Sequence, residues 1–399
     1  MASKPQSAMR RPPTSSFNLS LNNPSVRAVI YQILVVGAVG FVVWYLISNT
    51  MANLETRKIA TGFGFLEREA GLPIGEAVIE YSPADTYAKA LFVGLLNTLR
   101  VAILGIIFAT ILGTIIGISR LSRNWLLAQT ARVYVEVMRN LPLLLQLLFW
   151  WTLFRDMFPG PRDALSPLSG VFLSNRGVKI PVLLWQPEYA YVLATMLAGI
   201  VVSYLLHRWS RKRQDATGQQ FPFLRVMLGL VVVLPLLVFL VLGAPLELQK
   251  PELRGFNFVG GATLTPEFAA LLIGLVTYTA AFIAEIVRSG ILAVSHGQTE
   301  AALALGLKRG HVLRFVVLPQ ALRVIVPPTT SQYLNITKNS SLAVAIGYPD
   351  IVSVANTTLN QTGQAIEGIA IIMAVYLTIS LSISLFMNWY NKHIALVER

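Results

Sequence analysis

The chain has 399 residues, of which 54% are hydrophobic and only 13% charged, and its mean hydropathy is +0.61. Soluble domains carry roughly 25% charged residues, so the composition excludes an ordinary soluble domain and indicates a membrane protein. The net charge of +13 does not indicate a nucleic-acid partner, because uncharged apolar runs separate the basic residues. The lack of cysteine excludes disulfides and thiol chemistry, and four scattered histidines offer no metal cluster.

Eight stretches have the length of about twenty mostly apolar residues that a transmembrane helix needs. They run roughly over residues 28–48, 90–112, 133–154, 189–206, 222–243, 266–287, 326–346 and 367–389. The stretch 326–346 is the weakest of them because it contains a lysine. We therefore expect an all-α integral membrane protein with about eight transmembrane helices.

Charged residues alternate along the chain in a way that predicts its orientation. Cytoplasmic loops carry the excess of lysine and arginine. The tail 1–27 has four bases and no acid, and the loops after the second, fourth and sixth spans are also basic. The segment 50–87 instead holds six acids against three bases. We expect cytoplasmic tails at 1–27 and 391–399, an outer segment at 50–87, and an uncleaved anchor at 28–49.

Signatures of soluble enzymes are missing from the sequence. It contains no G-x-x-x-x-G-K-[ST] phosphate loop, no H-E-x-x-H and no G-x-S-x-G. A membrane-embedded enzyme would need paired catalytic groups within its spans, whereas Glu285 stands alone. We expect no catalytic residue, no metal site and no cofactor in this chain.

The loop between the sixth and seventh spans contains EAALALGLKRGHVLRFVVLP, from Glu300 to Pro319. Thr299 suits a helix N-cap, Glu300 suits the first turn, and the following alanines and leucines favour a short helix. Gly306 can end this helix, and Pro319 is expected to stop the element that follows. From these residues alone, an ordinary cytoplasmic loop remains the alternative.

The same loop matches a pattern of E-A-A, three residues, G, nine residues, an aliphatic residue, one residue and L-P. The matching residues are Glu300, Ala301, Ala302, Gly306, Val316, Leu318 and Pro319. The pattern resembles the EAA loop of ABC importer permeases. The stretches YTAAFIAEIVRSGILAVSHGQ at 278–298 and VEVMRNLPLLLQL at 135–147 look like the polar amino acid branch. GFGFLEREAGLPIGE and VGLLNTLRVA are similar to permeases of general L-amino-acid importers.

This resemblance implies a type I ABC importer permease in the bacterial inner membrane, with five core transmembrane helices and a cytoplasmic coupling helix. The coupling helix would dock on a separate ATP-binding subunit, which would hold ATP and Mg²⁺. The ATPase-coupling role falls on Glu300, Ala301, Ala302, Gly306, Leu318 and Pro319. Implied partners are a second homologous permease, a periplasmic amino-acid-binding protein and an L-amino acid. A heterodimer is expected, with a homodimer as the alternative.

Small members of the branch have five spans, so the additional helices of this chain are expected outside the transport core. The core would comprise residues 88–155, with its first two helices, and residues 266–390, with the EAA coupling loop at 296–328. The insertion at 156–265 would add two helices, and the segment 28–49 would add another.

A lysine in the seventh span is the main candidate for contact with substrate. Pro327 and Pro328 suit the first turn of a helix, which would place Lys338 about 15 Å further along, near the bilayer middle. A lysine there costs about 2.5 to 3.5 kcal/mol, so it should face protein or water. At 100° per residue, Ser331, Asn335 and Ser341 lie within about 60° of Lys338. The stripe predicts a substrate pathway, and a structural ion pair or interhelical hydrogen bonds are the alternative.

Three further polar residues of the spans are weaker candidates for the pathway. Glu285 lies near the cytoplasmic end of the sixth span, where a local pair with Arg288 competes with a substrate role. Asn97 and Gln146 lie well inside spans and can instead bond neighbouring helices. A secondary amino acid transporter without an ATPase is the functional alternative, but the coupling-ion carboxylates or inverted repeat that it needs are not evident.

Overall fold

The computed structural model describes residues 24–56, 61–219, 221–243 and 246–394. Most of the two predicted cytoplasmic tails lies outside these described residues. Within them, seven helices are long and apolar enough to cross a membrane, or eight if one bent pair counts as a span. The all-α class and the number of spans predicted from the sequence are therefore confirmed.

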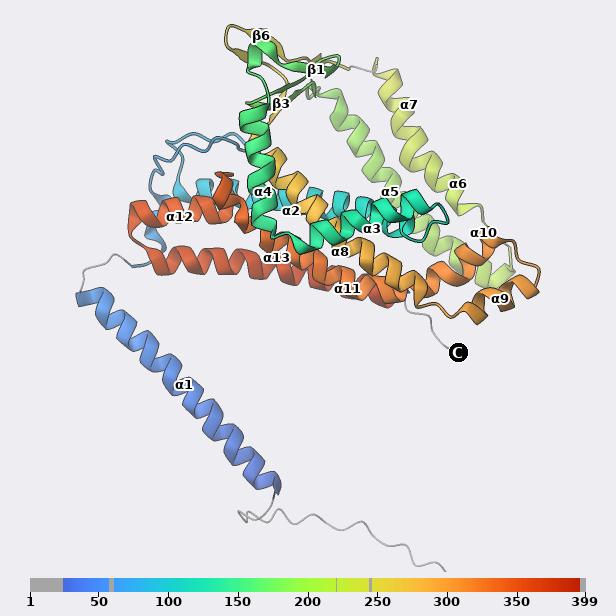
Figure 1. Cartoon of the computed structure of the whole chain (residues 1–399), viewed down its shortest axis with the longest axis horizontal. Coiled ribbons are helices and arrows are strands. Elements are labelled where there is room, and N and C mark those ends of the chain that lie inside the picture. The colour runs from blue at the N-terminus through green and yellow to red at the C-terminus, as the bar shows by residue number, and fades with distance from the viewer. Residues whose placement is uncertain (1–23, 57–60, 220, 244–245, 395–399) are drawn as a thin grey trace, which may run out of the picture.

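The helices follow the predicted spans closely and extend most of them (Figure 1). They are α1 (Pro24–Thr56), α2 (Tyr87–Ser119), α3 (Trp125–Asn140), α4 (Leu143–Thr152), α5 (Glu188–Thr217), α6 (Phe223–Leu228), α7 (Leu234–Val241), α8 (Pro266–Leu292), α9 (His296–Ala304), α10 (Arg309–Val312), α11 (Leu318–Asn339), α12 (Ile351–Thr362) and α13 (Ala365–Ile394). Single π-helical turns join α6 to α7 at Gly229–Val233 and α10 to α11 at Leu313–Val317.

The core is built where α2 packs along α8, which also contacts α3, α4 and α11. Two glycines one turn apart make this close approach possible. A Cβ at Gly113 would lie 2.8 Å from the carbonyl oxygen of Ala280, and one at Gly117 would lie 2.7 Å from that of Ala284. Small residues of this kind bring helices together where lipid offers no hydrophobic driving force. α2 and α8 therefore form the centre around which the other core helices are placed.

The third predicted span is bent. α3 and α4 meet at an angle of 104°, and the break falls at Leu141 and Pro142. Proline lacks the N–H that would continue the helix, and the residue before it is held in extended conformation. α4 consequently leaves the bundle nearly at a right angle to α3 and leads into the insertion (Figure 1).

The insertion contains β-structure that the sequence did not predict. β1 (Leu165–Leu168), β2 (Val171–Ser174), β3 (Gly177–Ile180) and β8 (Ala262–Leu264) form an antiparallel four-stranded sheet in the order β1-β2-β3-β8. β4 (Val182–Leu183) pairs with β5 (Leu248–Gln249), and β6 (Glu252–Arg254) pairs with β7 (Asn257–Val259). These strands join the bundle to a helical hairpin of α5 against α6 and α7.

The seventh span begins earlier than predicted. Pro327 and Pro328 lie inside α11 rather than in its first turn, and the span runs from Arg309 to Ile346. Pro319 does not stop the preceding element either, because it occupies the start of α11 after the π-helical turn. That turn displaces the backbone hydrogen-bond pattern by one residue, which lets helical structure continue into a proline. After Asn339 the chain forms a 3₁₀-helix at Ser340–Ile346 and then reaches α12.

Candidate functional site

The helix at the EAA loop starts four residues before the predicted first residue. Ser295 is its N-cap, whereas the predicted N-cap, Thr299, lies within α9. Glu300 is therefore in the middle of the helix, where its Oε1 lies 3.2 Å from Nδ1 of His296 one turn earlier. Both side chains are largely exposed, so this contact leaves the carboxylate of Glu300 accessible.

The end of α9 is defined by Gly306, which has a φ of +80°. The Gly306 N–H donates to the carbonyl of Leu303 at 2.9 Å, and the Leu307 N–H donates to that of Ala302 at 3.2 Å. These two bonds form a Schellman motif, which requires a left-handed residue that glycine adopts without strain. The predicted role of Gly306 in ending the helix is confirmed.

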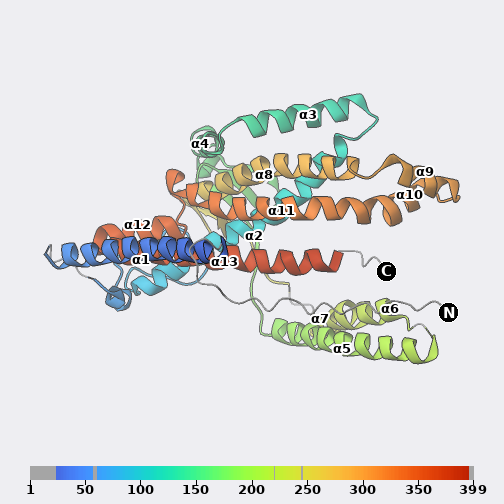
Figure 2. The same cartoon turned by 90° about the horizontal axis from the view of Figure 1, so that it is seen from below.

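The surface of α9 combines polar groups with an uncovered apolar side chain. Ala302 is buried, whereas Glu300 and Ala301 are exposed and Leu305 is 83% exposed. α9 packs on the π-helical turn that leads to Leu318 and Pro319. Both views show α9 at the far end of the bundle, which we call the α9 end (Figures 1 and 2). Leu305 at the end of α9 and Glu300 within it are thus both open to contact from outside the chain.

Next to this end, Glu285 lies between two arginines. Its carboxylate accepts hydrogen bonds from Arg288, at 2.6 Å on the same helix, and from Arg120 just after α2. The ion pair with Arg288 that the sequence suggested is present, and the second arginine ties α8 to the end of α2. The arrangement engages Glu285 in structure rather than leaving it free for a ligand.

An uncovered polar stripe runs along α11. Ser331, Asn335 and Lys338 are exposed, and they share one side of the helix with Val324 and Pro328. Within the described parts of the chain, Lys338 takes part in no ion pair. A lysine and an asparagine on a lipid-facing surface would be costly, so this stripe must face water or another protein.

The position of Lys338 follows from its neighbours rather than from a proline start. Ile336 packs against Gly105, where a Cβ would lie 2.8 Å from its Cδ1, and Gly105 is close to the midpoint of α2. Lys338 is thus near mid-span, but in the last turn of α11. Ser341 departs from the predicted stripe, because it lies in the 3₁₀-helix and donates to the carbonyl of Lys338 at 2.8 Å. A helix end at this depth is tolerated where it is buried in protein or lines a cavity.

The structure gives Asn97 and Gln146 bonds to backbone groups. The amide of Asn97 donates to the carbonyls of Glu76, at 2.8 Å, and Pro349, at 2.9 Å, and so joins α2 to two loops. Gln146 donates to Met138 and Leu141, whose carbonyls are left free by the break between α3 and α4. These contacts match the alternative of structural bonds, and they do not bring the two residues to the α11 stripe.

Comparison with known proteins places the chain in a family. Residues 196–396, about half of the chain, match the model of the binding-protein-dependent transport system inner membrane component. The chain is 51% identical over 385 residues to the general L-amino acid transport system permease protein AapQ of Rhizobium johnstonii, with 96% of each chain covered. The chain belongs to this family of transport permeases.

Two other relatives extend the comparison. The putative amino-acid ABC transporter permease protein YhdX of Escherichia coli is 53% identical, with 96% of this chain and 98% of the relative covered. The glutamate/glutamine/aspartate/asparagine transport system permease protein BztB of Rhodobacter capsulatus is 42% identical, with 97% and 99% covered. Both comparisons include the insertion, so its strands and hairpin belong to the part of the permease that these relatives match.

At the other end of the permease, a buried carboxylate holds three segments together, and the sequence analysis missed it. Glu76 accepts hydrogen bonds from Arg100 of α2 and from Thr265, the N-cap of α8, both at 2.5 Å. Burial raises the pKa of the Glu76 carboxyl, while these two donors oppose the shift. Its partners lie far apart in the sequence, so no local pattern marks the cluster.

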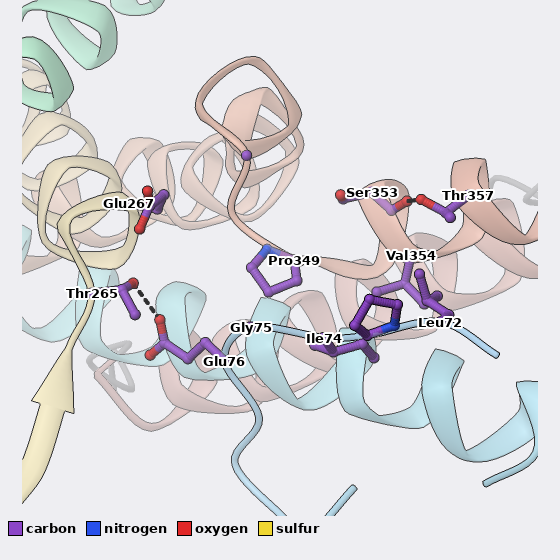
Figure 3. Close-up of a pocket in the computed structure, with 12 residues that line it drawn as sticks. Leu72, Ile74, Gly75, Glu76, Thr265, Glu267, Pro349, Ser353, Val354 and Thr357 are labelled. Carbon is purple, nitrogen blue, oxygen red and sulfur yellow. Dashed lines mark hydrogen bonds between the residues drawn. The ribbon is translucent and has the colours of Figure 1, made fainter. Parts of the chain in front are cut away.

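Glu76 also lines a cavity of about 360 Å³ at this end (Figure 3). The cavity lies between the outer segment around Leu72, the start of α8 at Glu267, and α12, which contributes Ser353 and Thr357. Its lining includes the carboxylates of Glu76 and Glu267 and the hydroxyls of Thr265, Ser353 and Thr357.

Proposed function

We propose that this chain is the permease subunit of an ABC importer that moves L-amino acids inward across the inner membrane. The relatives named above are amino-acid transport permeases, and they match the chain over almost its whole length. The observation that carries the proposal is the exposed helix α9, capped by Gly306 and bearing Glu300, Ala301 and the uncovered Leu305. A permease without an ATP site of its own needs an exposed surface through which the movement of an ATPase can be transmitted to its transmembrane helices.

In this proposal the α9 end is cytoplasmic, and a separate ATP-binding subunit docks on α9. ATP and Mg²⁺ bind to that subunit, and this chain contributes no catalytic residue. A short capped helix transmits a displacement better than a flexible loop, because its backbone is already ordered. Glu300 and Leu305 supply a charged and an apolar contact, while Leu318 and Pro319 connect the docking surface to α11.

The polar stripe of α11 faces a second, homologous permease across the substrate pathway. Lys338 then meets the carboxylate of the amino acid, since it has no ion-pair partner in the described parts of its own chain. A heterodimer supplies a different facing surface, which suits a pathway for chemically asymmetric substrates. The opposite end, with the cavity beside Glu76, receives a periplasmic amino-acid-binding protein.

The test is uptake of labelled amino acid by proteoliposomes that contain this chain, a second permease, the ATPase and the binding protein. Uptake should require all four proteins and ATP. Glu300→Lys should prevent stable ATPase binding and stimulated hydrolysis, because it reverses the charge of the docking surface. Glu252→Lys, an equally exposed charge reversal in the strand region, is the matched control and should retain both.

The same preparation separates the alternative function. Uptake by this chain without the ATPase, driven by a proton or sodium gradient, would identify a secondary transporter and overturn the proposal. Full coupling in the Glu300→Lys complex would instead refute only the docking of the ATPase at α9.

A further inference from the structure

The hairpin of the insertion carries a cluster of basic side chains at one end. The cluster, which we call the basic end of the hairpin, comprises Arg208, Arg211, Lys212, Arg213 and Arg225. All five side chains are exposed, and Asp215 is the one acid among residues 207–225. Among the described residues none of the five forms an ion pair, and Arg213 bonds the neutral side chain of Gln219 at 3.1 Å. Four net positive charges are therefore left without a protein counter-charge.

Aromatic rings fix the depth of this cluster at a membrane surface. The guanidinium of Arg208 lies 4.9 Å from the ring centre of Tyr204, and that of Arg213 lies 5.4 Å from the ring of Trp209. Tyrosine and tryptophan concentrate at the headgroup level of a bilayer. The apolar part of α5 ends at these rings, so the basic side chains begin where the hydrocarbon ends.

Little of this chain covers the outer faces of the hairpin. α5 packs chiefly against α6, α7 and the π-helical turn between them. In the most apolar stretch of α5, only 11% of the residues are buried within the chain. In the corresponding stretch of α6 and α7, the buried share is only 6%. Figure 2 shows the hairpin set apart from α9 and α10, although its basic end points to the same end of the molecule. The basic end is therefore a surface separate from α9.

We propose that the basic end of the hairpin binds the headgroups of anionic phospholipids in the leaflet on the α9 side. Arg208, Arg211 and Lys212 lie within an arc of about 100° on α5, so their side chains can converge on one or two phosphates. Clusters of four to eight basic residues at a membrane surface attract anionic lipid, with each contributing roughly fivefold in affinity. This site anchors the insertion to the bilayer, and its assignment to the cytoplasmic leaflet rests on the proposed orientation.

The experiment uses the purified full-length chain without an ATPase, so its outcome is independent of the transport function. The chain is incubated with equal amounts of phosphatidylglycerol and phosphatidylcholine, and native mass spectrometry counts the lipids retained. We expect a preference for phosphatidylglycerol that falls by about 25-fold in Arg208→Gln/Arg211→Gln, from two contributions of roughly fivefold. The charge-preserving pair Arg208→Lys/Arg211→Lys should keep the preference and shows that loss is not caused by misfolding.

A matched control and a competitor complete the test. Arg123→Gln/Arg132→Gln removes one exposed arginine just before α3 and one in its middle, and should change the preference by less than about twofold. Inorganic phosphate at 50-fold excess should not displace the lipid, because it lacks the acyl chains that hold a headgroup at the interface. An equal preference for both lipids, an equal loss in the control pair, or displacement by phosphate would each overturn the proposal.

Discussion

Replacement of Gly306 tests the coupling role of α9 through backbone geometry alone. Gly306 has a φ of +80°, and a Cβ at this position would meet nothing within 4 Å. A side chain at position 306 would therefore meet no steric clash. The free-energy cost of replacing Gly306 comes only from holding the new residue in the left-handed conformation. The nearby Gly310 also has open space around it but lies in α10 with ordinary helical geometry, which makes it a matched control.

The expected magnitude follows from this conformation. A left-handed backbone costs an ordinary L-residue about 1 to 2 kcal/mol, a β-branched residue more, and asparagine less. This strain shifts the equilibrium between the capped and frayed end of α9 by about 5- to 30-fold. Gly310→Ala should instead stabilise its helix by up to about 1 kcal/mol. Global stability should not change, since the affected turn is exposed.

The assay is the ratio of amino acid imported to ATP hydrolysed in the reconstituted complex. Function should decline in the order glycine, asparagine, alanine, valine at position 306, while Gly310→Ala behaves as the wild type. Each complex is checked by thermal unfolding, which should be the same for all five. A Gly306→Val complex with wild-type transport and hydrolysis would show that the capped end of α9 is not where the ATPase acts.

Three further predictions concern residues outside α9. Lys338→Met should reduce uptake at least about tenfold, while ATP hydrolysis and assembly of the complex stay intact. Lys338→Arg keeps the positive charge and should retain part of the uptake. Unchanged uptake in Lys338→Met would show that the α11 stripe is only a packing surface. Glu285→Gln should lower the free energy of unfolding by about 2 kcal/mol, because it leaves Arg120 without its charged partner. Arg288→Gln should lower it by less than about 0.5 kcal/mol, and thermal melts measure both changes. Burial raises the pKa of the Asp350 carboxyl to about 7, so the contribution of this group to stability should be largest below about pH 4. That contribution should decline on the order of 4 kcal/mol as the pH rises through 7. Asp350→Asn keeps the N-cap of α12 and should remove this slope in urea titrations at several pH values; an unaltered slope would assign it to another group.

The spans could be predicted from the sequence because each is a local signal. The span at residues 90–112 could be predicted from its apolar composition and length alone. The role of Gly306 in ending a helix could be predicted from its position after a run of helix-forming residues. The start of α11 could not be found this way. Pro327 and Pro328 favour a helix start, but the tertiary packing of α11 on α8 and α13 stabilises a helix that passes through them. The early start of α9 at His296, after the N-cap Ser295, was missed because Thr299 offers an equally good local cap.

Long-range contacts account for most of what was missed. The strands of the insertion are only two to four residues long, too short for alternation to indicate them, and β3 pairs with β8 about 80 residues away. The structural role of Glu76 depends on its hydrogen bonds with Arg100 and Thr265. No regular spacing in the sequence connects these two residues to Glu76. Gln146 was a weak candidate for the pathway because it is a polar residue well inside a predicted span. The break at Pro142 turns its amide toward free carbonyls instead.

The packing of α8 and α11 explains how a displacement of α9 can reach Lys338. α9 is bracketed by these two helices in the sequence, and a Cβ at Gly290 of α8 would lie 2.3 Å from Ile325 of α11. So close an approach near the α9 end leaves no room for the helices to slide independently, because cores are densely packed. A push on α9 should therefore tilt them together. At mid-span α11 ends after Lys338 and continues as the 3₁₀-helix Ser340–Ile346. In the proposed mechanism, the surface that receives the ATPase and Lys338 lie at opposite ends of this packed unit. Glu300→Lys and Lys338→Met should then both reduce transport, whereas only Glu300→Lys should prevent ATPase binding.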